Sequence, residues 1–415
     1  MAWVAVRNAP TFVSVDIFEA GPRSGRRRRQ ANEPYFEFLN RVGSDFHAPI
    51  RDLLQTWLDR VPTADQSDIV GRLRSGDDEK FDSAFWELYV HQILTGYGFE
   101  VEIHPDIPGT PNHPDFLVHA ETPFYLEAAI VGAPAASRKA ESRLSEVEAV
   151  LDAVRVEGWT LSFTWNRIGS APLASARLRD VLLRWVDGLD HDRVRAVLEG
   201  AWTGHSAGDG GGVASFMSDD RLPSRSYVDG DWDLDFTALP VKPGRTAALV
   251  SVRGPGRAGG VDNETRLREK LRSKAKRYGT DLPHPLVIAA MSNTEVPTRP
   301  YDVIPVLYGL HRLGPARVTD PTRLESEGHW RTRTGWRRSH NPYVVLAPDL
   351  HLHNIHTRAP WVCRTLDPDV DVALDLPWAA PLDLSVPEPL APAHAPDLTK
   401  LGVTGDWCRG LPDIE

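Results

Sequence analysis

Two acidic residues lie twelve positions apart in the segment HPDFLVHAETPFYLEAAIV, which covers residues 113–131. Asp115 follows a proline, and Glu127 interrupts a run of apolar residues. Two carboxylates in close contact repel each other, so that one stays protonated unless a cation lies between them. A hard divalent cation, Mg²⁺ or Mn²⁺, bound by one or two carboxylates together with water and phosphate oxygens, would remove this cost. The segment therefore indicates a candidate metal site.

The alternation of side chains along a β-strand decides whether these acids meet. Asp115 and Leu117 share one face of the first strand, and Tyr125, Glu127 and Ala129 share one face of the second. The two acids lie side by side only if the connecting loop has an odd number of residues, as a three-residue loop would. The unbroken apolar run around Glu127 predicts burial on both sheet faces. An ordinary hairpin with two solvent-facing acids is the alternative.

A helix is predicted over residues 81–97, before a strand at 99–104 and the hairpin. Glycines at its end supply the left-handed residue that commonly stops a helix. The helix is apolar over most of its circumference, with one narrow polar stripe made of Ser83, Glu87 and His91. Such a stripe is often only the more hydrated side of a helix. Its position before the hairpin nevertheless makes Glu87 a candidate third acid.

The order of helix, strand and hairpin resembles the PD-(D/E)XK, or restriction-endonuclease-like, nuclease superfamily. The resemblance is carried by Glu87 on the helix, the dipeptide Pro114-Asp115 on one strand and Glu127 on the next. It covers residues 81–131, and extends less specifically to a helix at 263–279 and a strand at 285–291. The resemblance implies that Asp115, Glu127 and Glu87 hold one or two Mg²⁺ ions. It also implies a lysine, two positions after the second acid, that aligns the attacking water.

The chain departs from this pattern because Ala129 stands where the superfamily has its lysine. Lys274 is the candidate replacement, in the segment ETRLREKLRSKAKRYG. At about 100° per residue, Lys274 falls in the middle of an apolar stripe. That stripe consists of Leu267, Leu271, Ala275 and Tyr278. Either the lysine stem passes the packed residues to reach water, or the ammonium meets the buried carboxylates.

Further residues are candidates for contacts with phosphate or substrate. His113 directly precedes the Pro-Asp pair, and His91 lies one helical turn after Glu87. The segment RTRTGWRRSHN, residues 331–341, interleaves basic and aromatic side chains, as surfaces that bind nucleic acid do. Its candidate contacts are Arg333, Arg337 and Arg338. A solvated turn is the alternative interpretation of this segment.

Composition places the chain among globular proteins. Of its 415 residues, 41% are hydrophobic and 25% are charged, and the net charge of −10 argues against a generally basic coat for nucleic acid. Two cysteines are too few for a disulfide framework or a cysteine-based zinc module, and favour a reducing, cytoplasmic location. No segment approaches the ~20 apolar residues of a membrane helix. We therefore expect no membrane association.

The predicted fold class is α/β, with a mixed central sheet flanked by helices in a restriction-endonuclease-like core. We expect an N-terminal strand and helical extension over residues 1–80 and a nuclease-like core with insertions over 81–310. Residues 311–415 form a predicted C-terminal extension, rich in Trp and Pro, that packs on the core. A homo-oligomer or a protein partner is compatible with this organisation.

The functional hypothesis is a Mg²⁺-dependent phosphodiesterase that hydrolyses DNA. Asp115 and Glu127 would bind the metal, Glu87 would support it, and Lys274 would align water or offset phosphate charge. The missing lysine at position 129 favours an alternative, a catalytically inactive relative that acts as a nucleic-acid-binding or assembly subunit. A second alternative is an unrelated structural protein in which the acids are incidental.

Crowding of the two acids without metal also makes a prediction about stability. Replacing Asp115 or Glu127 by the corresponding amide should leave the metal-free protein equally or more stable, because like-charge repulsion is relieved. A loss above roughly 2 kcal/mol would instead indicate a buried ion pair or network.

Overall fold

In the computed structural model the chain forms two compact units. The first comprises Met1–Arg28, Pro34–Ala133 and Asp262–Gly410, and the second Arg29–Glu33, Pro134–Val261 and Leu411–Glu415. The structure describes residues 15–24, 29, 33–132, 140, 143–144, 146–151, 154, 158–202, 222–241, 263–279, 281–293, 300–311, 324–337, 340–348, 350–356, 358–378 and 397–403.

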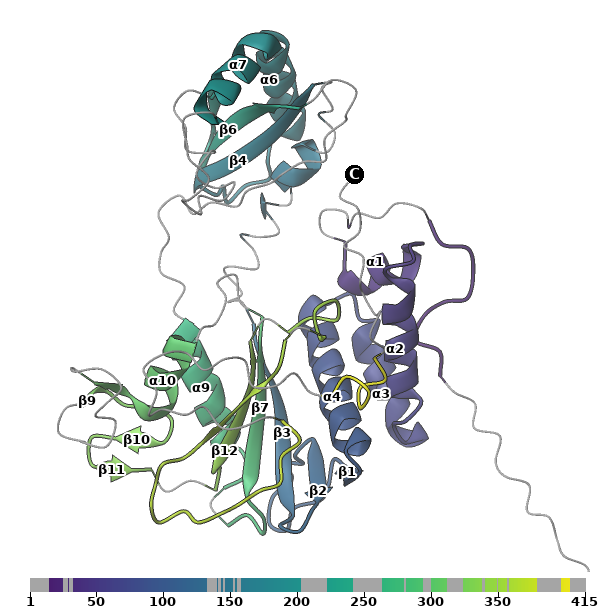
Figure 1. Ribbon diagram of the computed structural model, residues 1–415, viewed down its shortest axis with the longest axis vertical. Helices are drawn as coiled ribbons and strands as arrows, with labels where there is room; N and C mark the ends of the chain where they lie inside the picture. The colour runs from purple at the N-terminus through teal and green to yellow at the C-terminus, as the bar shows by residue number, and fades with distance from the viewer. Residues whose placement is uncertain are drawn as a thin grey trace, which may run out of the picture. The chain divides into compact units, whose positions relative to one another are not determined.

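A six-stranded mixed sheet is the centre of the first unit, in the order β1-β2-β3-β7-β12-β13 (Figure 1). The first three strands pair antiparallel, β3, β7 and β12 run parallel, and β13 is antiparallel to β12. The strands are β1 (Glu100–Ile103), β2 (Phe116–His119), β3 (Phe124–Val131), β7 (Leu286–Ser292), β12 (Tyr343–Pro348) and β13 (Trp361–Arg364). The predicted α/β class with a mixed central sheet is confirmed.

Helices cover both faces of this sheet and form a separate hydrophobic core on each side (Figure 1). One core contains side chains of α1 (Tyr35–Arg41), α2 (Ala48–Leu58), α3 (Thr63–Leu73) and α4 (Asp78–Gly96). The other contains side chains of α9 (Asn263–Lys276) and α10 (Pro300–Tyr308). The predicted helix at 263–279 and strand at 285–291 correspond to α9 and β7. Any group on β3 therefore faces either α4 or α9.

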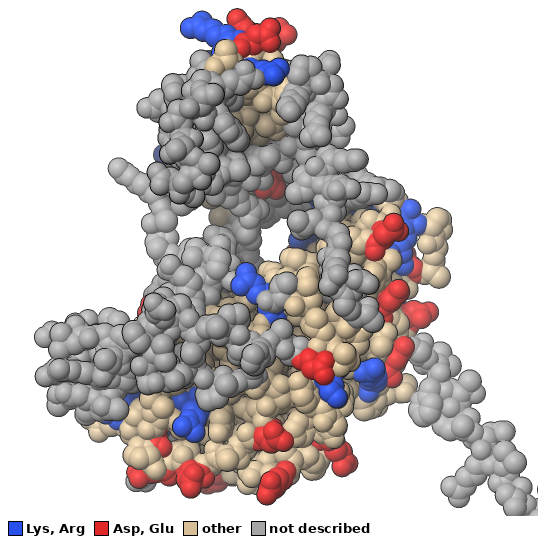
Figure 2. Space-filling model, viewed as in Figure 1, with Lys and Arg blue, Asp and Glu red and all other residues tan. Residues whose placement is uncertain are grey.

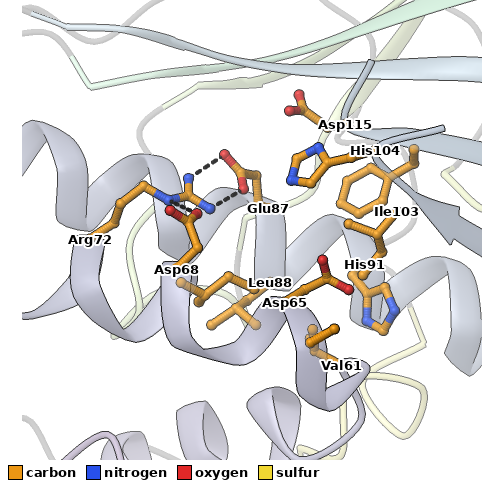
Figure 3. A pocket seen from close by; sticks show the side chains of 13 residues that line it. Val61, Asp65, Asp68, Arg72, Glu87, Leu88, His91, Ile103, His104 and Asp115 are labelled. Atoms are coloured by element: carbon orange, nitrogen blue, oxygen red, sulfur yellow. Dashed lines mark hydrogen bonds and ion pairs between the residues drawn. The ribbon is translucent and has the colours of Figure 1, made fainter. Parts of the chain in front are cut away.

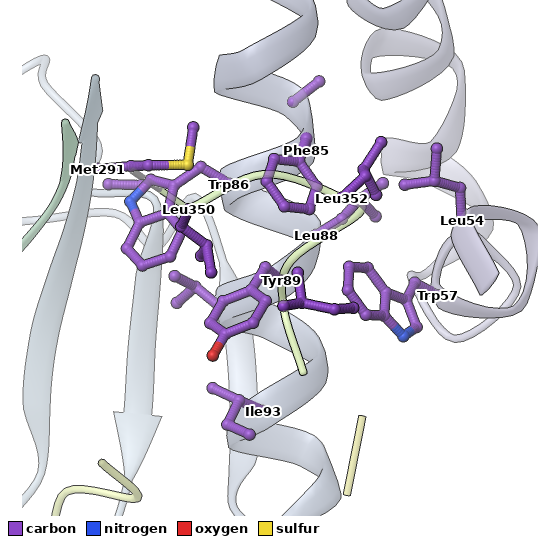
Figure 4. Close-up of a cluster of buried hydrophobic side chains, with 14 of the residues drawn as sticks. Leu54, Trp57, Phe85, Trp86, Leu88, Tyr89, Ile93, Met291, Leu350 and Leu352 are labelled. Carbon is purple, nitrogen blue, oxygen red and sulfur yellow. The ribbon is translucent and has the colours of Figure 1, made fainter. Parts of the chain in front are cut away.

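Helix α4 begins at a side-chain cap and is buried along most of its length. The Asp77 carboxylate accepts hydrogen bonds from the backbone N–H groups of Glu79 and Lys80, which satisfies free donors at the helix start. At the other end Gly98 has φ +92°, a left-handed conformation that favours glycine. Trp86 packs in the core (Figure 4), and its indole donates to the Ala289 carbonyl on β7 at 2.8 Å. The predicted helix over residues 81–97 is confirmed.

Segments from the C-terminal part of the chain complete the first unit. Strands β12 and β13 extend the central sheet, and residues 397–403 contact α2 and α4. The Trp57 indole donates to the Leu401 carbonyl at 2.8 Å, and the Gln92 amide donates to the Lys400 carbonyl at 2.7 Å. Two two-stranded sheets also lie in this part: β8 (Leu310–His311) with β9 (Leu324–Ser326), and β10 (Arg331–Thr332) with β11 (Gly335–Trp336).

The second unit has its own sheet and core. Its antiparallel strands lie in the order β4-β6-β5, with bounds β4 (Trp159–Arg167), β5 (Ser224–Asp229) and β6 (Trp232–Pro240). Helices α6 (Ser175–Asp187) and α7 (His191–Trp202) accompany the sheet. In neither unit do the described residues form a helix that is both long and apolar enough to cross a bilayer.

Candidate active site

The β2–β3 hairpin brings Asp115 next to the strand that carries Glu127. In the observed register Phe116 pairs with Leu126 and Leu117 with Tyr125, so one further step along β2 sets residue 115 opposite residue 127. The last paired residues, Val118 and Phe124, bracket five residues, so the predicted odd-numbered connection is found with five residues in place of three. The Asp115 carboxylate accepts a 2.6 Å hydrogen bond from the N–H of residue 128. It thereby satisfies a backbone donor of β3 that lies beyond the first residue of β2.

Three side chains from the end of α9 converge on Glu127, which is 0% exposed. The Lys274 ammonium donates to Glu127 Oε1, and the Tyr278 hydroxyl donates to Oε2. The Arg277 guanidinium lies 3.2 Å from Oε1. A buried carboxylate is stable only when its charge and its lone pairs are compensated, and here two cations and a phenol compensate them.

The position of these three residues at the C-terminal end of α9 explains why they act together. Lys274 lies in the last turn of α9, and Arg277 and Tyr278 lie in the turn that directly follows the helix. The Lys274 side chain is 19% exposed, so its ammonium turns inward toward Glu127. Of the two alternatives for this lysine, contact with a buried carboxylate is the one observed. The short spacing after Lys274 could have indicated Arg277 and Tyr278 from the sequence, where Tyr278 was assigned only to the apolar stripe.

The Tyr278 hydroxyl stays protonated in this setting. Burial, the Glu127 charge and the hydrogen bond to Glu127 together raise the pKa of the Tyr278 phenol well above its usual range. The hydroxyl also lies 3.2 Å from the carbonyl oxygen of His113, in the loop before Asp115. Tyr278 therefore serves as a hydrogen-bond donor that joins α9 to the hairpin.

Of the two acids, Asp115 is the one whose charged form is disfavoured in the folded protein. Burial raises the pKa of its carboxyl well above the usual range, and the charges of Glu127 and Glu87 raise it further. Lys274 and the N–H of residue 128 lower it, but less. The sequence-based expectation of mutual repulsion is thus met at Asp115, whereas the charge of Glu127 is compensated by α9.

Glu87 reaches toward Asp115 from α4, on the opposite side of the sheet from Lys274. Arg72 of α3 binds both Glu87 oxygens at 2.6 Å, and Asp68 contacts the same guanidinium at 2.9 Å (Figure 3). The Glu87 charge still contributes to the raised pKa of the Asp115 carboxyl. Arg72 was not a candidate from the sequence, because nothing in the spacing of α3 points to α4.

The two candidate histidines differ in their placement. His91 is 4% exposed, and burial together with Arg60 lowers the pKa of its imidazole to about 4, so the ring is neutral at pH 7. It lines a cavity that also reaches Asp115. The His113 ring instead contacts the Pro105 carbonyl at 3.3 Å and the Asp106 carboxylate at 3.2 Å. The structure thus brings His91, but not the His113 ring, to the lining of this cavity.

The candidate arginines of the β10–β11 hairpin lie apart from the Glu127 cluster. Arg337 donates to the His329 carbonyl at 3.1 Å and lies 3.6 Å from Glu327. Arg333 is exposed in the turn, and its backbone N–H lies 3.4 Å from Glu327. Arg338 lies outside the described residues.

Asp115 and Glu127 fit the ligand preference of Mg²⁺, which commonly takes one or two carboxylates and keeps several waters. The donor set is hard oxygen, and a cation between the two groups would remove the repulsion that raises the pKa of the Asp115 carboxyl. Glu87 fits less well as a direct ligand because Arg72 binds both of its oxygens. Within the described residues no group of three or more His, Cys, Asp or Glu could hold a metal ion. Among the described residues, the protein would therefore supply these two carboxylates as metal ligands.

In the metal-free protein, Asp115 should lower the free energy of unfolding, and it should do so more as pH rises. Its folded-state pKa lies above 3.8, the ordinary value of an aspartate, so the folded protein loses stability as pH rises from about 3.8 through the folded pKa. Asp115→Asn remains neutral and can still accept from the N–H of residue 128. We expect the variant to be more stable than wild type above this window, by on the order of 1 kcal/mol, and equal to it below.

Urea denaturation in EDTA at a series of pH values measures this difference. A difference that does not grow with pH would show that the Asp115 carboxylate is not destabilising in the folded protein. Added Mg²⁺ should reverse the order of stability, because a ligand that binds only the folded wild type stabilises it.

Comparisons with known proteins give no family assignment: no protein-family model, no curated protein and no solved structure matches the chain.

Proposed function

We propose that this protein is a divergent metal-dependent nuclease that hydrolyses DNA phosphodiester bonds, in a cytoplasmic setting. The proposal is carried by the contact between Lys274 of α9 and Glu127 of β3. The chain lacks a lysine at position 129, where the superfamily that it resembles has one. A lysine from another element, Lys274, reaches Glu127 instead. Position 129 and Glu127 share a sheet face, so the lysine reaches the face where the superfamily residue would lie.

The residues of the site have complementary tasks in this proposal. Glu127 accepts the single proton of the Tyr278 hydroxyl and one N–H of the Lys274 ammonium, so that the ammonium is the group with further donors to offer. Lys274 would orient the attacking water or donate to a phosphate oxygen, which offsets the charge that builds up during hydrolysis. When bound by Asp115 and Glu127, Mg²⁺ or Mn²⁺ would supply Lewis-acid activation. Glu87 and Arg72 would act as positioning residues behind Asp115.

The charge of α9 supports a polyanionic substrate. The helix and the residue after it carry seven basic residues against two acidic ones: Arg266, Arg268, Lys270, Arg272, Lys274, Lys276 and Arg277 against Glu264 and Glu269. Burial lowers the pKa of the Arg272 guanidinium, and the nearby charges of Arg337 and Arg268 lower it further. Such mutual repulsion would be relieved by phosphate groups.

The wider surface does not carry a continuous basic coat. On the face in Figure 2 Lys and Arg are interspersed with Asp and Glu among the residues drawn in colour. This distribution agrees with the net charge of −10 and favours a local nucleic-acid contact near α9 and the hairpin of Arg333 and Arg337.

One observation favours a second candidate function, a catalytically inactive nuclease-fold protein that binds nucleic acid or takes part in an assembly. Glu127 is compensated by Lys274, Arg277 and Tyr278, and Glu87 by Arg72. A cation would have to compete with these basic groups for the carboxylates. Binding of DNA without cleavage is the result that this candidate predicts.

The test is an assay of single- and double-stranded DNA cleavage by the full chain with Mg²⁺, Mn²⁺ or EDTA. We expect cleavage with either metal and background activity in EDTA, because the carboxylates alone cannot activate water near a phosphate. Asp115→Ala should have no activity with either metal.

The control is His113→Ala, because the His113 ring faces Pro105 and Asp106 instead of the acids. Activity in EDTA, or full activity of Asp115→Ala, would refute the metal mechanism. Wild type that binds DNA but cleaves no substrate would favour the inactive relative.

A further inference from the structure

A cavity of about 130 Å³ lies between α3, α4 and the strands β1 and β2 (Figure 3). Its apolar walls include Leu88, Ile103 and Phe116, and charged and imidazole side chains line the rest. Asp115 lines the same cavity, so the cavity is directly adjacent to the proposed catalytic acids. A cavity with apolar walls and a few polar groups is the usual form of a small-ligand site.

The charges in the cavity select the kind of ligand. Four acids line it against one arginine, and two of those acids, Asp68 and Glu87, are bound by Arg72. Asp65 and Asp115 supply the other carboxylates. In the described part of the chain no side-chain hydrogen bond or ion pair engages Asp65. An excess of carboxylates repels phosphate and favours a group with N–H donors.

A buried histidine provides an independent sign of a missing partner. His91 lines the cavity and is more than nine-tenths buried, and its Nδ1 has no hydrogen-bond partner among the described residues. Buried polar atoms in folded proteins are nearly always paired, so a group inside the cavity would account for this atom. A neutral imidazole offers one donor and one acceptor, which suits a heterocycle.

The backbone at His104 is the second irregular feature of the cavity. His104 has φ +49°, the sole positive value for a non-glycine residue in the described ranges. Its N–H donates to the Asp115 carbonyl at 3.0 Å, and its ring lies beside Asp115 and Glu87 (Figure 3). A residue held in this sparsely populated region costs free energy, and such positions cluster at functional sites.

We propose that this cavity binds one unpaired nucleobase of the substrate strand, and that it prefers a base with an exocyclic amine, such as cytosine. The proposal rests on the proposed function, because Asp115 belongs to both sites. The flat faces of the base would contact Ile103 and Phe116, and the Asp65 carboxylate would accept from the amine, as acids do from cytosine N4. A base inside a duplex cannot enter such a cavity. The substrate is therefore DNA that is single-stranded or locally unpaired.

The experiment measures the binding of labelled single-stranded oligo-dC and oligo-dU, and of a duplex, to the full chain in EDTA. The two pyrimidines differ at position 4, where cytosine carries its amine and uracil a carbonyl, and at N3, which accepts in cytosine and carries a proton in uracil. We expect oligo-dC to bind about ten-fold more tightly than oligo-dU. Ala64→Phe, which fills the cavity from α3, should abolish this preference. Ser67→Phe is the matched control, because Ser67 is exposed on the same helix and does not line the cavity.

Binding without metal separates the two proposals. Equal binding of oligo-dC and oligo-dU, or an unchanged preference in Ala64→Phe, would overturn the base site even if the protein cleaves DNA. A cytosine preference that Ala64→Phe removes would support the base site even if cleavage fails. Should Ala64→Phe not fold, Asp65→Ala decides in its place: loss of the preference supports the site, and an unchanged preference refutes it.

Discussion

Lys274→Met should lower the rate of metal-dependent DNA cleavage by about 10²–10³-fold, with the fold intact. Methionine keeps the length and the apolar stem of lysine, so the packing of α9 on β3 should survive. The change removes the ammonium that contacts Glu127, and with it the donor that would orient water or stabilise charge on the phosphate. Single-turnover cleavage with saturating Mg²⁺ measures the effect on the chemical step.

Lys276→Met is the matched control for this variant. Lys276 is exposed on the same helix, two residues from Lys274, and has no contact with Glu127. A loss shared by both variants would point to a general effect of the charge of α9 on DNA binding. Unchanged cleavage in Lys274→Met would remove Lys274 from the catalytic assignment.

Glu127→Gln should lower the free energy of unfolding by about 3 kcal/mol, even though it removes a charge from a buried position. The carboxylate compensates Lys274 and Arg277, and its loss leaves both cations close together with a neutral amide between them. The Arg277 side chain is 46% exposed, so water screens part of this cost and the loss lies at the lower end of the range for broken buried ion pairs. This expectation replaces the sequence-based one, in which either acid could be neutralised without loss.

Urea denaturation followed by circular dichroism measures the change, and hydrogen exchange of β3 amides assigns it to the first unit. Asp115→Asn is the control, because the acid that it replaces is the one whose pKa burial and like charges raise. If Glu127→Gln were as stable as wild type, the contacts from α9 would contribute nothing to the fold.

Local sequence patterns alone determined much of this site. The apolar run around Glu127 and the odd-numbered connection placed the acid on one buried strand face, and the register confirms it. Helical periodicity placed Lys274 on the apolar side of α9, where it contacts Glu127. These predictions succeeded because alternation in strands and the period of a helix depend only on neighbouring residues.

The partners of the acids depended on the tertiary structure. Arg72 binds Glu87 because α3 packs beside α4, and Asp65 lines the same cavity as His104 and Asp115 because α3, α4 and the strand pair enclose it. No spacing along the chain encodes these contacts, since each joins elements that are brought together by the packing of separate apolar faces. The compensation of the Glu127 charge and the raised pKa of the Asp115 carboxyl likewise depend on burial, and burial is decided only when the chain folds.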